Sequence, residues 1–143
     1  MIELKGQAPI EASLMRHISQ RQFEAILGLS GPKRFSHFIK RVADEERAWG
    51  LWDDGWALMT NSDGDQVFPL WPASEYADLF RTGEWATFTA KEISLEELLN
   101  NLIPKLVEMR ALPGVFPTPG GKGITPTPGE LATALREELE RYG

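Results

Sequence analysis

Apolar side chains recur at helical spacing in several stretches of this chain. Residues three and four positions apart lie on one face of an α-helix, so each stretch predicts a helix with one buried face. The first helix begins at Ser13 or Ser19 and ends at Leu29, and residues 1–12 before it have no clear period and are compatible with a loose arm. The other helices are expected from Pro32 to about Arg47, over a short segment after Pro72, from Ser94 beyond Leu106, and from Pro128 almost to Tyr142.

The residues at the ends of these stretches support the predicted helices. Ser94 and Glu97 form a capping box, in which the serine accepts a hydrogen bond from the glutamate amide and the glutamate side chain reaches back. Thr127 and Glu130 form a second capping box ahead of the last helix. Pro104 lies inside the helix that begins at Ser94. Because a proline removes one helical hydrogen bond, we expect a kink or a split there.

The centre of the chain has the pattern of a short antiparallel sheet that is rich in tryptophan. Asp54-Gly55 tolerates the positive φ angles of a two-residue turn, so residues 49–60 are expected to form a hairpin. Consecutive strands joined by tight turns are antiparallel. Further strands are expected over 66–71 and 85–89, after a second turn at 61–65, and a C-terminal hairpin is expected from 114–118 and 123–125 around the turn 120–122. Helices flanking such a sheet give an α+β fold, and we expect one domain over residues 1–143.

Both faces of this predicted sheet are apolar. Side chains alternate between the two faces of a strand, so a sheet with one face in water should alternate apolar and polar residues. One face is expected to carry Trp49, Leu51, Trp56, Leu58, Val67 and Trp71, and the other Gly50, Trp52, Ala57, Met59, Phe68 and Leu70. Either helices cover both faces, or one face is an exposed aromatic surface that binds a partner.

Composition and charge narrow the class of protein. The 143 residues include no cysteine, which excludes disulfides and thiolate metal sites and suits a reducing compartment. The formal net charge is −6, whereas nucleic-acid binding requires a basic face. The N-terminal residues lack the pattern of a signal peptide, and no apolar run approaches the ~20 residues that span a bilayer. We therefore expect a cytoplasmic protein that binds neither nucleic acid nor membranes.

No motif in the sequence has the spacing of a known catalytic or cofactor site. The turn 61–65 lacks the glycine and glutamate positions of a calcium loop. The glycine-rich segment 120–123 lacks the first glycine and the hydroxyl residue of a phosphate-binding loop. His17 and His37 lie on separate predicted helices without suitable carboxylates, so we expect neither a metal nor a cofactor. Glu84 is a candidate acid without a partner.

Several short motifs follow one another along most of the chain. They are Trp49-Gly50-Leu51, Asp53-Asp54-Gly55-Trp56-Ala57, Phe68-Pro69-Leu70-Trp71-Pro72, Glu75-Tyr76-Ala77, Gly83-Glu84-Trp85, Ser94-Leu95-Glu96-Glu97-Leu98, Val115-Phe116-Pro117-Thr118-Pro119 and Lys122-Gly123. In this order they resemble a bacterial family, domain of unknown function 2750. The resemblance implies a bacterial intracellular protein and no particular reaction. Residues 67–80 are also similar to secretion-accessory proteins of the serine-sensitivity-enhancing type, a likeness at the level of the fold.

Three hypotheses about function follow from these patterns. The first is a non-enzymatic protein-binding or accessory module, indicated by the acidic charge and the aromatic sheet, and an immunity protein is its most specific form. The second is a small-molecule-binding protein or an enzyme of modest activity, with a pocket between the tryptophan-rich face, Glu84 and the loop 117–123. The third is a structural homo-oligomer whose apolar sheet face pairs with itself. The candidate binding residues are Trp49, Trp56, Trp71, Trp85, Glu84 and Lys122.

Overall fold

The computed structural model describes residues 20–142 of the chain. The chain divides into two compact units after Ser30, and each unit is described by itself. In the first unit residues 20–27 are helical, which agrees with the described part of the helix expected up to Leu29. The expected start of that helix, the arm at residues 1–12 and His17 lie outside the described residues. The expectation of a single domain stays a prediction.

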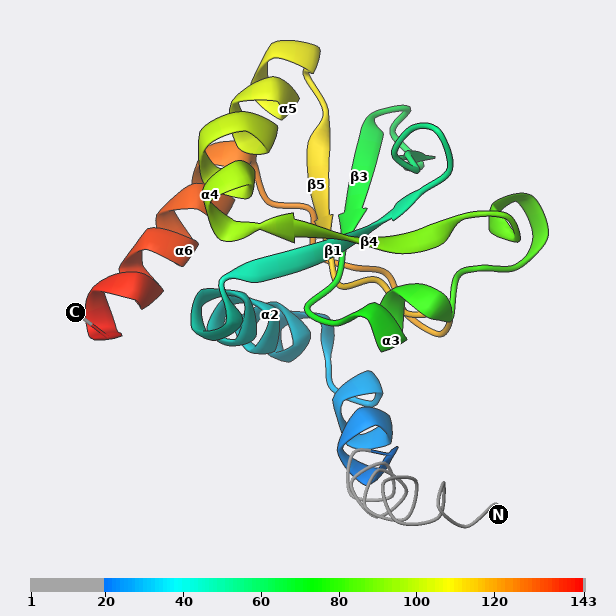
Figure 1. The fold of residues 1–143 in the computed structure, drawn as a ribbon, viewed down its shortest axis with the longest axis horizontal. Coiled ribbons are helices and arrows are strands. Elements are labelled where there is room, and N and C mark those ends of the chain that lie inside the picture. Colours follow the sequence, from blue (N-terminus) through cyan, green and yellow to red (C-terminus); the bar gives the residue numbers. More distant parts are fainter. Residues whose placement is uncertain (1–19, 143) are drawn as a thin grey trace, which may run out of the picture. The chain divides into compact units, whose positions relative to one another are not determined.

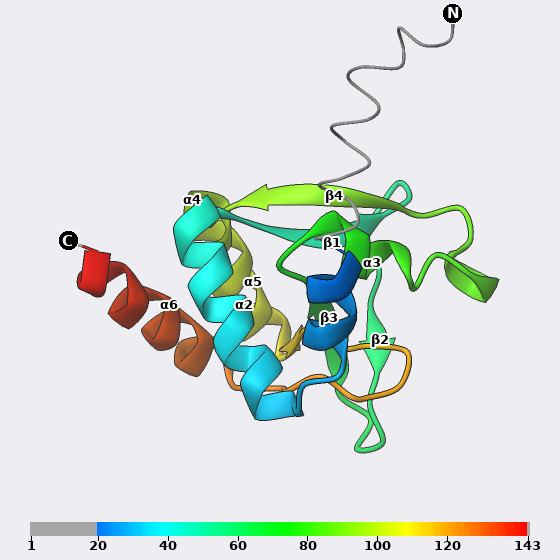
Figure 2. The same cartoon turned by 90° about the horizontal axis from the view of Figure 1, so that it is seen from below.

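The second unit, Gly31–Gly143, is built from helices and short strands (Figures 1 and 2). Its helical segments are α2 (Gly31–Glu45), α3 (Ser74–Asp78), η1 (Gly83–Trp85), α4 (Leu95–Glu97), η2 (Leu98–Leu102), α5 (Ile103–Met109) and α6 (Pro128–Tyr142). Its strands are β1 (Arg47–Trp52), β2 (Met59–Thr60), β3 (Gln66–Leu70), β4 (Thr89–Ser94) and β5 (Leu112–Val115). This confirms the predicted α+β fold class. Within the described residues no helix is long and apolar enough to cross a membrane.

The strands form two small sheets (Figure 1), and one bridging residue pair joins them. β1 pairs with β4 in antiparallel orientation over the whole of both strands. In the second sheet β3 lies in the middle, antiparallel to β2 and parallel to β5. Trp49 and Trp71 join the two sheets, because the amide of each donates to the carbonyl of the other at 2.9 Å. The parallel pairing of β3 with β5 corrects the predicted meander, which contained antiparallel neighbours only.

The chain turns at Asp54-Gly55, but the predicted two-residue turn is wrong, because three residues, 53–55, lie between the bridge partners Trp52 and Trp56. Asp54 has a φ of 57°, in the left-handed region, and Gly55 has a φ of 156°. Beyond the turn, Trp52 and Trp56 form a single bridge. The Trp56 ring lies on Gly50, where an added Cβ would be 2.9 Å from the ring atom Cζ3. The place beside β1 that the hairpin partner was expected to fill is taken by β4.

The strand predicted over residues 85–89 is displaced along the chain. Gly83–Trp85 forms η1, and β4 begins only at Thr89. Ile93 is the only buried residue of β4, and the strand also carries Lys91 and Glu92. The segment therefore has no alternation of apolar and polar residues, which is the signal for a strand.

Helices lie on both sides of the ribbon formed by β1 and β4. Figure 1 shows α2 and α3 on one side of this ribbon, and α5 with the second sheet on the other. The predicted grouping of Trp56 with Trp49 and Trp71 is wrong, because the Trp56 ring packs against Trp52 and Phe68. The largest fully buried side chains are Trp71, Phe38, Phe116, Leu51, Leu70, Leu98, Leu106, Leu131, Leu135, Val42, Val115 and Pro69. Cover on both sides of β1 accounts for the apolar residues on both faces of that strand, whereas β4 is mostly exposed.

Both predicted capping boxes lie at the start of a helix, but in the first the Glu97 carboxylate accepts from the Asn101 side chain and does not reach back to Ser94. Ser94 Oγ accepts a hydrogen bond from the Glu97 amide at 3.0 Å. Thr127 Oγ1 accepts one from the Glu130 amide at 3.1 Å, and the Glu130 carboxylate accepts one from the Thr127 amide at 2.9 Å. The second box is therefore complete in both directions.

Pro104 splits the long helix, as its position predicts. It is the second residue of α5, and the five residues before this helix, Leu98–Leu102, form a π-helical turn. A proline has no amide hydrogen and its ring collides with the preceding turn, so a wider turn accommodates it.

Candidate ligand pocket

The chain folds back on itself between β5 and α6. Val115 and Ile124 form an antiparallel bridge with N–O distances of 2.7 and 3.1 Å. Nearer the tip, Thr118 and Gly121 pair with N–O distances of 2.9 and 3.1 Å, and the two residues between them are a proline and a glycine, which favour tight turns. This confirms the predicted C-terminal hairpin, but its turn lies at Pro119-Gly120 and not at residues 120–122. We call residues 116–123 the proline–glycine loop.

The proline–glycine loop begins with a strained residue. Phe116 has a φ of 57°, in the left-handed region, which costs a non-glycine residue about 1–3 kcal/mol. Pro117 adds to the strain, because a proline restricts the residue before it to extended conformations. The Phe116 side chain is fully buried, with its ring centroid 4.7 Å from that of Tyr76 and 6.1 Å from that of His37. Such a conformation persists only where the surrounding structure over-determines it.

Two buried side chains fix the loop through its carbonyl oxygens. Arg34 of α2 is only 5% exposed, and its guanidinium donates from Nε to the Phe116 carbonyl at 3.1 Å and from Nη2 to the Lys122 carbonyl at 2.9 Å. The indole Nε1 of Trp71 donates to the Pro117 carbonyl at 2.9 Å. Hydrogen bonds that involve a charged group contribute about 1.5–3 kcal/mol each. These bonds are therefore large enough to offset the strain at Phe116.

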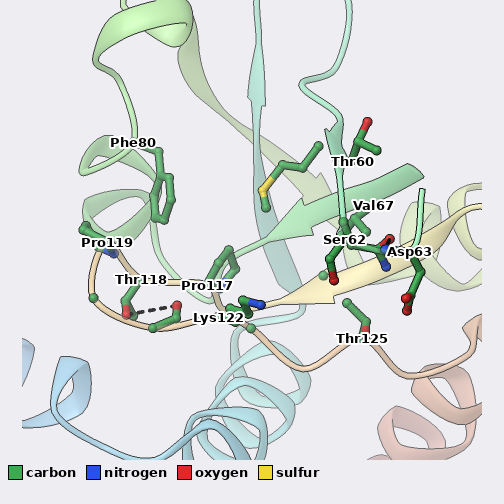
Figure 3. A pocket seen from close by; sticks show the side chains of 16 residues that line it. Thr60, Ser62, Asp63, Val67, Phe80, Pro117, Thr118, Pro119, Lys122 and Thr125 are labelled. Carbon is green, nitrogen blue, oxygen red and sulfur yellow. Dashed lines mark hydrogen bonds between the residues drawn. The ribbon is translucent and has the colours of Figure 1, made fainter. Parts of the chain in front are cut away.

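An open pocket of about 700 Å³ lies beside the proline–glycine loop (Figure 3). The loop forms one wall, and the turn after β2 forms the facing wall. In Figure 3 Phe80 and Pro119 lie at one end of the pocket and Asp63 at the other. The lining residues are Met59, Thr60, Asn61, Ser62, Asp63, Val67, Phe80, Gly114, Pro117, Thr118, Pro119, Gly120, Gly121, Lys122, Gly123 and Thr125.

Close packing explains two of the glycines at the pocket. Val67 of β3 and Gly114 of β5 both line it, and a Cβ at position 114 would lie 2.5 Å from Cγ1 of Val67. At Gly123 a Cβ would lie 2.6 Å from the Val115 carbonyl oxygen. Only glycine fits where a side chain or a backbone carbonyl approaches so closely.

The facing wall is the turn that the sequence predicts at residues 61–65. Asn61 Oδ1 accepts hydrogen bonds from the amides of Asp63 at 3.0 Å and Asp65 at 2.9 Å. Gly64 has a φ of 86°, which glycine adopts without strain. The residues after Asn61 in the turn are exposed. One amide side chain therefore organises this wall from within the turn itself.

Of the predicted binding residues, Lys122 lines the pocket and Trp71 supports it from behind. Trp71 is completely buried, so it can influence a ligand only through the Pro117 carbonyl that it holds. Trp85 contacts the lining residue Phe80, with 6.3 Å between their ring centroids. The Phe80 ring centroid in turn lies 5.2 Å from that of Trp71. Glu84 is exposed on η1 and does not line the pocket.

Trp49 and Trp56 lie elsewhere on the sheets, and neither lines the pocket. Trp56 packs edge-on against Trp52 at 5.0 Å, and Lys91 Nζ lies 3.9 Å from the Trp52 ring centroid and 5.5 Å from that of Trp56. The Arg47 guanidinium lies over the Trp49 ring, with its Cζ atom 5.5 Å from the ring centroid. Both tryptophans are half-buried, and each ring already makes a cation–π contact with a side chain of the same protein.

Two residues with shifted pKa values lie behind the proline–glycine loop, against Phe116. Burial lowers the pKa of His37 and the neighbouring Arg41 lowers it further, whereas Glu45 raises it. Burial raises the pKa of Tyr76, against a smaller opposing effect of Arg41. The buried Nε2 atom of His37 has no hydrogen-bond partner among the described residues. In the same part of the chain, no three His, Cys, Asp or Glu side chains are grouped so that they could hold a metal ion.

Arg34 and Phe116 were missed by the sequence analysis. Arg34 lies one helical turn before Phe38, on the apolar stripe of α2, and a charged residue on such a stripe was the available signal. Phe116 offered none, because its residue type does not encode a left-handed conformation. The turn at 61–65 was identified as a turn, but its place opposite the loop depends on strand pairing that is distant in sequence.

Residues 35–135 match the family model described as Protein of unknown function (DUF2750). The matched range includes every residue that lines the pocket, as well as Trp71, and begins one residue after Arg34. A search of the curated proteins and a search of the solved structures each found no match.

Proposed function

The chain belongs to the family described as Protein of unknown function (DUF2750), and we propose that it is a non-enzymatic protein that binds a small ligand in the pocket beside the proline–glycine loop. One observation carries this proposal. A strained backbone at Phe116 is maintained by hydrogen bonds from the buried side chains of Arg34 and Trp71. Strain of this kind clusters at ligand clamps and other functional sites, where the surrounding structure compensates for it.

The pocket also has the size and composition of a small-molecule site. Its volume of about 700 Å³ lies within the range of about 300–1,000 Å³ that is usual for such sites. Val67, Met59 and Phe80 offer apolar surface, and hydroxyl, amide and charged groups surround it. In such a site, a few placed polar groups in mostly apolar surroundings fix the orientation of the ligand.

The chemistry of the lining residues favours binding over catalysis. Among the lining residues, the ionisable side chains are Asp63 and Lys122, and they belong to different walls. Nucleophilic catalysis needs a nucleophile and a base within hydrogen-bond reach of each other, with a third group that orients the base. The lining residues do not supply such a set.

Ligand screening with a blocked pocket tests the proposal. Trp71 donates to the loop, so we expect ligands from a metabolite library to change intrinsic tryptophan fluorescence and to raise the melting temperature. Thr125 is exposed and lines the pocket, so the larger ring in Thr125→Phe should obstruct ligand binding and remove both effects. Thr133→Phe, at an exposed position on α6, is the matched control and should bind normally. A library without a single stabilising ligand, or stabilisation that persists in Thr125→Phe, would contradict the proposal.

A protein partner is the second candidate function, and the half-exposed tryptophan rings favour it. Trp49, Trp56 and Trp85 are each partly exposed, and tryptophan is enriched where proteins bind one another. Trp49→Ser should then abolish recovery of a stoichiometric partner from the native host. The control Val107→Ser, at a side chain that is 60% exposed on α5, should not. Equal recovery with both variants would eliminate this candidate.

A location in the bacterial cytoplasm is part of the same proposal. The chain has no cysteine, which suits a reducing compartment. Its net charge of −6 favours solubility and fits a partner with a basic surface. Fractionation of the native host should therefore place the protein with cytoplasmic enzymes, and recovery with the membrane or secreted fraction would contradict the location.

A further inference from the structure

The polar groups of the proline–glycine loop are arranged unequally. Most of its carbonyl oxygens already accept hydrogen bonds from the protein. Those of Phe116 and Lys122 bind Arg34, and that of Pro117 binds Trp71. The carbonyl of Thr118 accepts from the Gly121 amide, and the carbonyl of Gly121 accepts from the Thr118 amide. The acceptor capacity of the loop is therefore largely used before any ligand arrives.

The unused groups of the loop include several donors. The amides of Gly120, Lys122 and Gly123 have no hydrogen-bond partner among residues 20–142. All three residues line the pocket, and the two glycines can do so only with backbone atoms. Successive amides in a turn make a concave site for anions. The Lys122 ammonium adds a positive charge, and its side chain is exposed and forms no ion pair within the described residues.

A second positive charge stands behind the loop. The Arg34 guanidinium is buried, and its Nη2 atom would lie 3.3 Å from a Cβ at Gly121. Charges in a partly desolvated site are screened less than those in water. The Lys122 ammonium is therefore the main positive charge that this wall offers a ligand, in a protein with a net charge of −6.

Asp63 on the facing wall limits the charge that a ligand can bring. It lines the same pocket, so each negative charge on a ligand is repelled by its carboxylate. A dianionic phosphate meets twice the repulsion of a carboxylate. Val67, Met59 and Phe80 leave room for an apolar body beside the anionic group.

From this arrangement we infer that the ligand of the pocket is a small carboxylate with an apolar body, whose anionic group binds the amides of Lys122 and Gly123 and the Lys122 ammonium. This inference rests on the proposed function, since it names the chemical class of ligand for the same pocket. It differs from a nucleotide phosphate loop, because no helix begins at residues 120–123.

Three probes distinguish the charge of the ligand from its shape. Benzoate carries the carboxylate and an apolar ring, benzamide is its neutral counterpart, and inorganic phosphate has the charge without the ring. Binding is followed by titration of the full chain, with backbone amide chemical shifts of the loop as the readout. We expect benzoate to shift the amides of Lys122 and Gly123 and to bind about tenfold more tightly than benzamide, as one charge-assisted hydrogen bond predicts.

Two substitutions with opposite expected effects on benzoate affinity test the two walls. Lys122→Met should weaken benzoate binding about tenfold, because it removes the ammonium and keeps the apolar stem. Asp63→Asn should strengthen binding about two- to threefold, because it removes a repulsion that water and salt partly screen. The matched control Lys40→Met, at an exposed position on α2, should leave binding unchanged.

Each other outcome overturns the inference in a recognisable way. Equal binding of benzoate and benzamide, both abolished by Thr125→Phe, retains the ligand pocket and overturns the carboxylate assignment. Tighter binding of phosphate than of benzoate assigns the loop to phosphate groups instead. Benzoate binding that is unaffected by Lys122→Met, or the absence of binding at millimolar concentrations, also overturns the assignment, whereas the proposed function falls only with the library screen.

Discussion

The proline–glycine loop is fixed by residues far from it in the sequence, whereas the turn that faces it across the pocket is fixed by its own residues. Arg34 of α2 and Trp71 after β3 hold the carbonyls of the loop from the core. In the facing turn, Asn61 Oδ1 binds two amides of the same turn. The loop can therefore change only if the core changes, while the turn can open by itself. Local opening of exposed segments with few buried contacts requires little free energy.

This difference gives the two walls separate roles in the proposed function. A rigid wall sets where the ligand's polar group lies, because its donors are already in place before binding. A wall with only local hydrogen bonds can adjust to the ligand's shape without disturbing the core. The following substitutions test whether the two walls differ in this way.

Trp71→Ala should have the largest effect, a loss of about 3–5 kcal/mol in the free energy of unfolding. The side chain is fully buried, and its removal also leaves the Pro117 carbonyl without a donor. Urea unfolding followed by circular dichroism measures this loss. Trp71→Phe keeps much of the ring and should lose less, about 1–3 kcal/mol for the unpaired carbonyl. A loss below about 1 kcal/mol for Trp71→Ala would show that the loop is not held from the core.

Arg34→Met should follow, with a loss of about 2–4 kcal/mol in the free energy of unfolding. The apolar stem remains, but the carbonyls of Phe116 and Lys122 lose their donors, and an unpaired buried polar group costs about 1–3 kcal/mol. Chemical denaturation measures the change. Arg136→Met, at an exposed position on α6, is the control and should stay within about 0.5 kcal/mol of the parent chain. Equal effects of the two substitutions would remove Arg34 from the explanation of the loop.

Asn61→Ala should cost only about 1 kcal/mol, since the amides of Asp63 and Asp65 become accessible to water when they lose their acceptor. Hydrogen exchange should show faster exchange at these two amides and no change in the proline–glycine loop. Ser62→Ala is the control, because the Ser62 side chain makes no hydrogen bond within the described residues. Faster exchange in the loop as well would mean that the two walls are coupled.

Acidification should have the smallest effect, and the part of it that is due to His37 should act behind the rigid wall. The folded protein has a His37 pKa below the ordinary value of 6.5, so below that pH the unfolded chain binds more protons than the folded one. Stability is therefore fully present above about pH 6.5 and falls as the pH drops toward the folded pKa. Melting temperatures between pH 7.5 and pH 5 should fall less steeply in His37→Phe than in the parent chain. Parallel curves for the two proteins would contradict this assignment.

The parts of the fold that depend on neighbouring residues could be predicted from the sequence. The capping residues Ser94 and Thr127, the break at Pro104 and the turn at Asp54 follow from side-chain chemistry within a few positions. The pairing of β1 with β4 could not be predicted, because the charged Lys91 lies where a strand pattern would need an apolar residue.

The candidate site was predicted only in part. Lys122 and the loop around it were identified, and the loop does line a pocket. Trp71 was identified as a binding residue, whereas its buried position makes it a support of the loop. Arg34 and Phe116 were missed, because their roles depend on a contact between α2 and a loop that lies more than half the chain away. Local sequence patterns indicate secondary structure and do not predict contacts between residues so far apart in the sequence.

The parallel pairing of β3 with β5 also sets when the pocket can exist during synthesis and folding. Val67 and Gly114 lie on opposite sides of a long connection that contains α3, β4 and α5. Contacts distant in sequence form late, because the loop-closure entropy is lost before the contacts are gained. A nascent chain that ends before β5 lacks Gly114 and the proline–glycine loop, which line the pocket. In that chain one edge of β3 also has no partner strand. Ligand binding at this pocket would therefore be a property of the completed chain, and it would distinguish finished molecules from truncated ones.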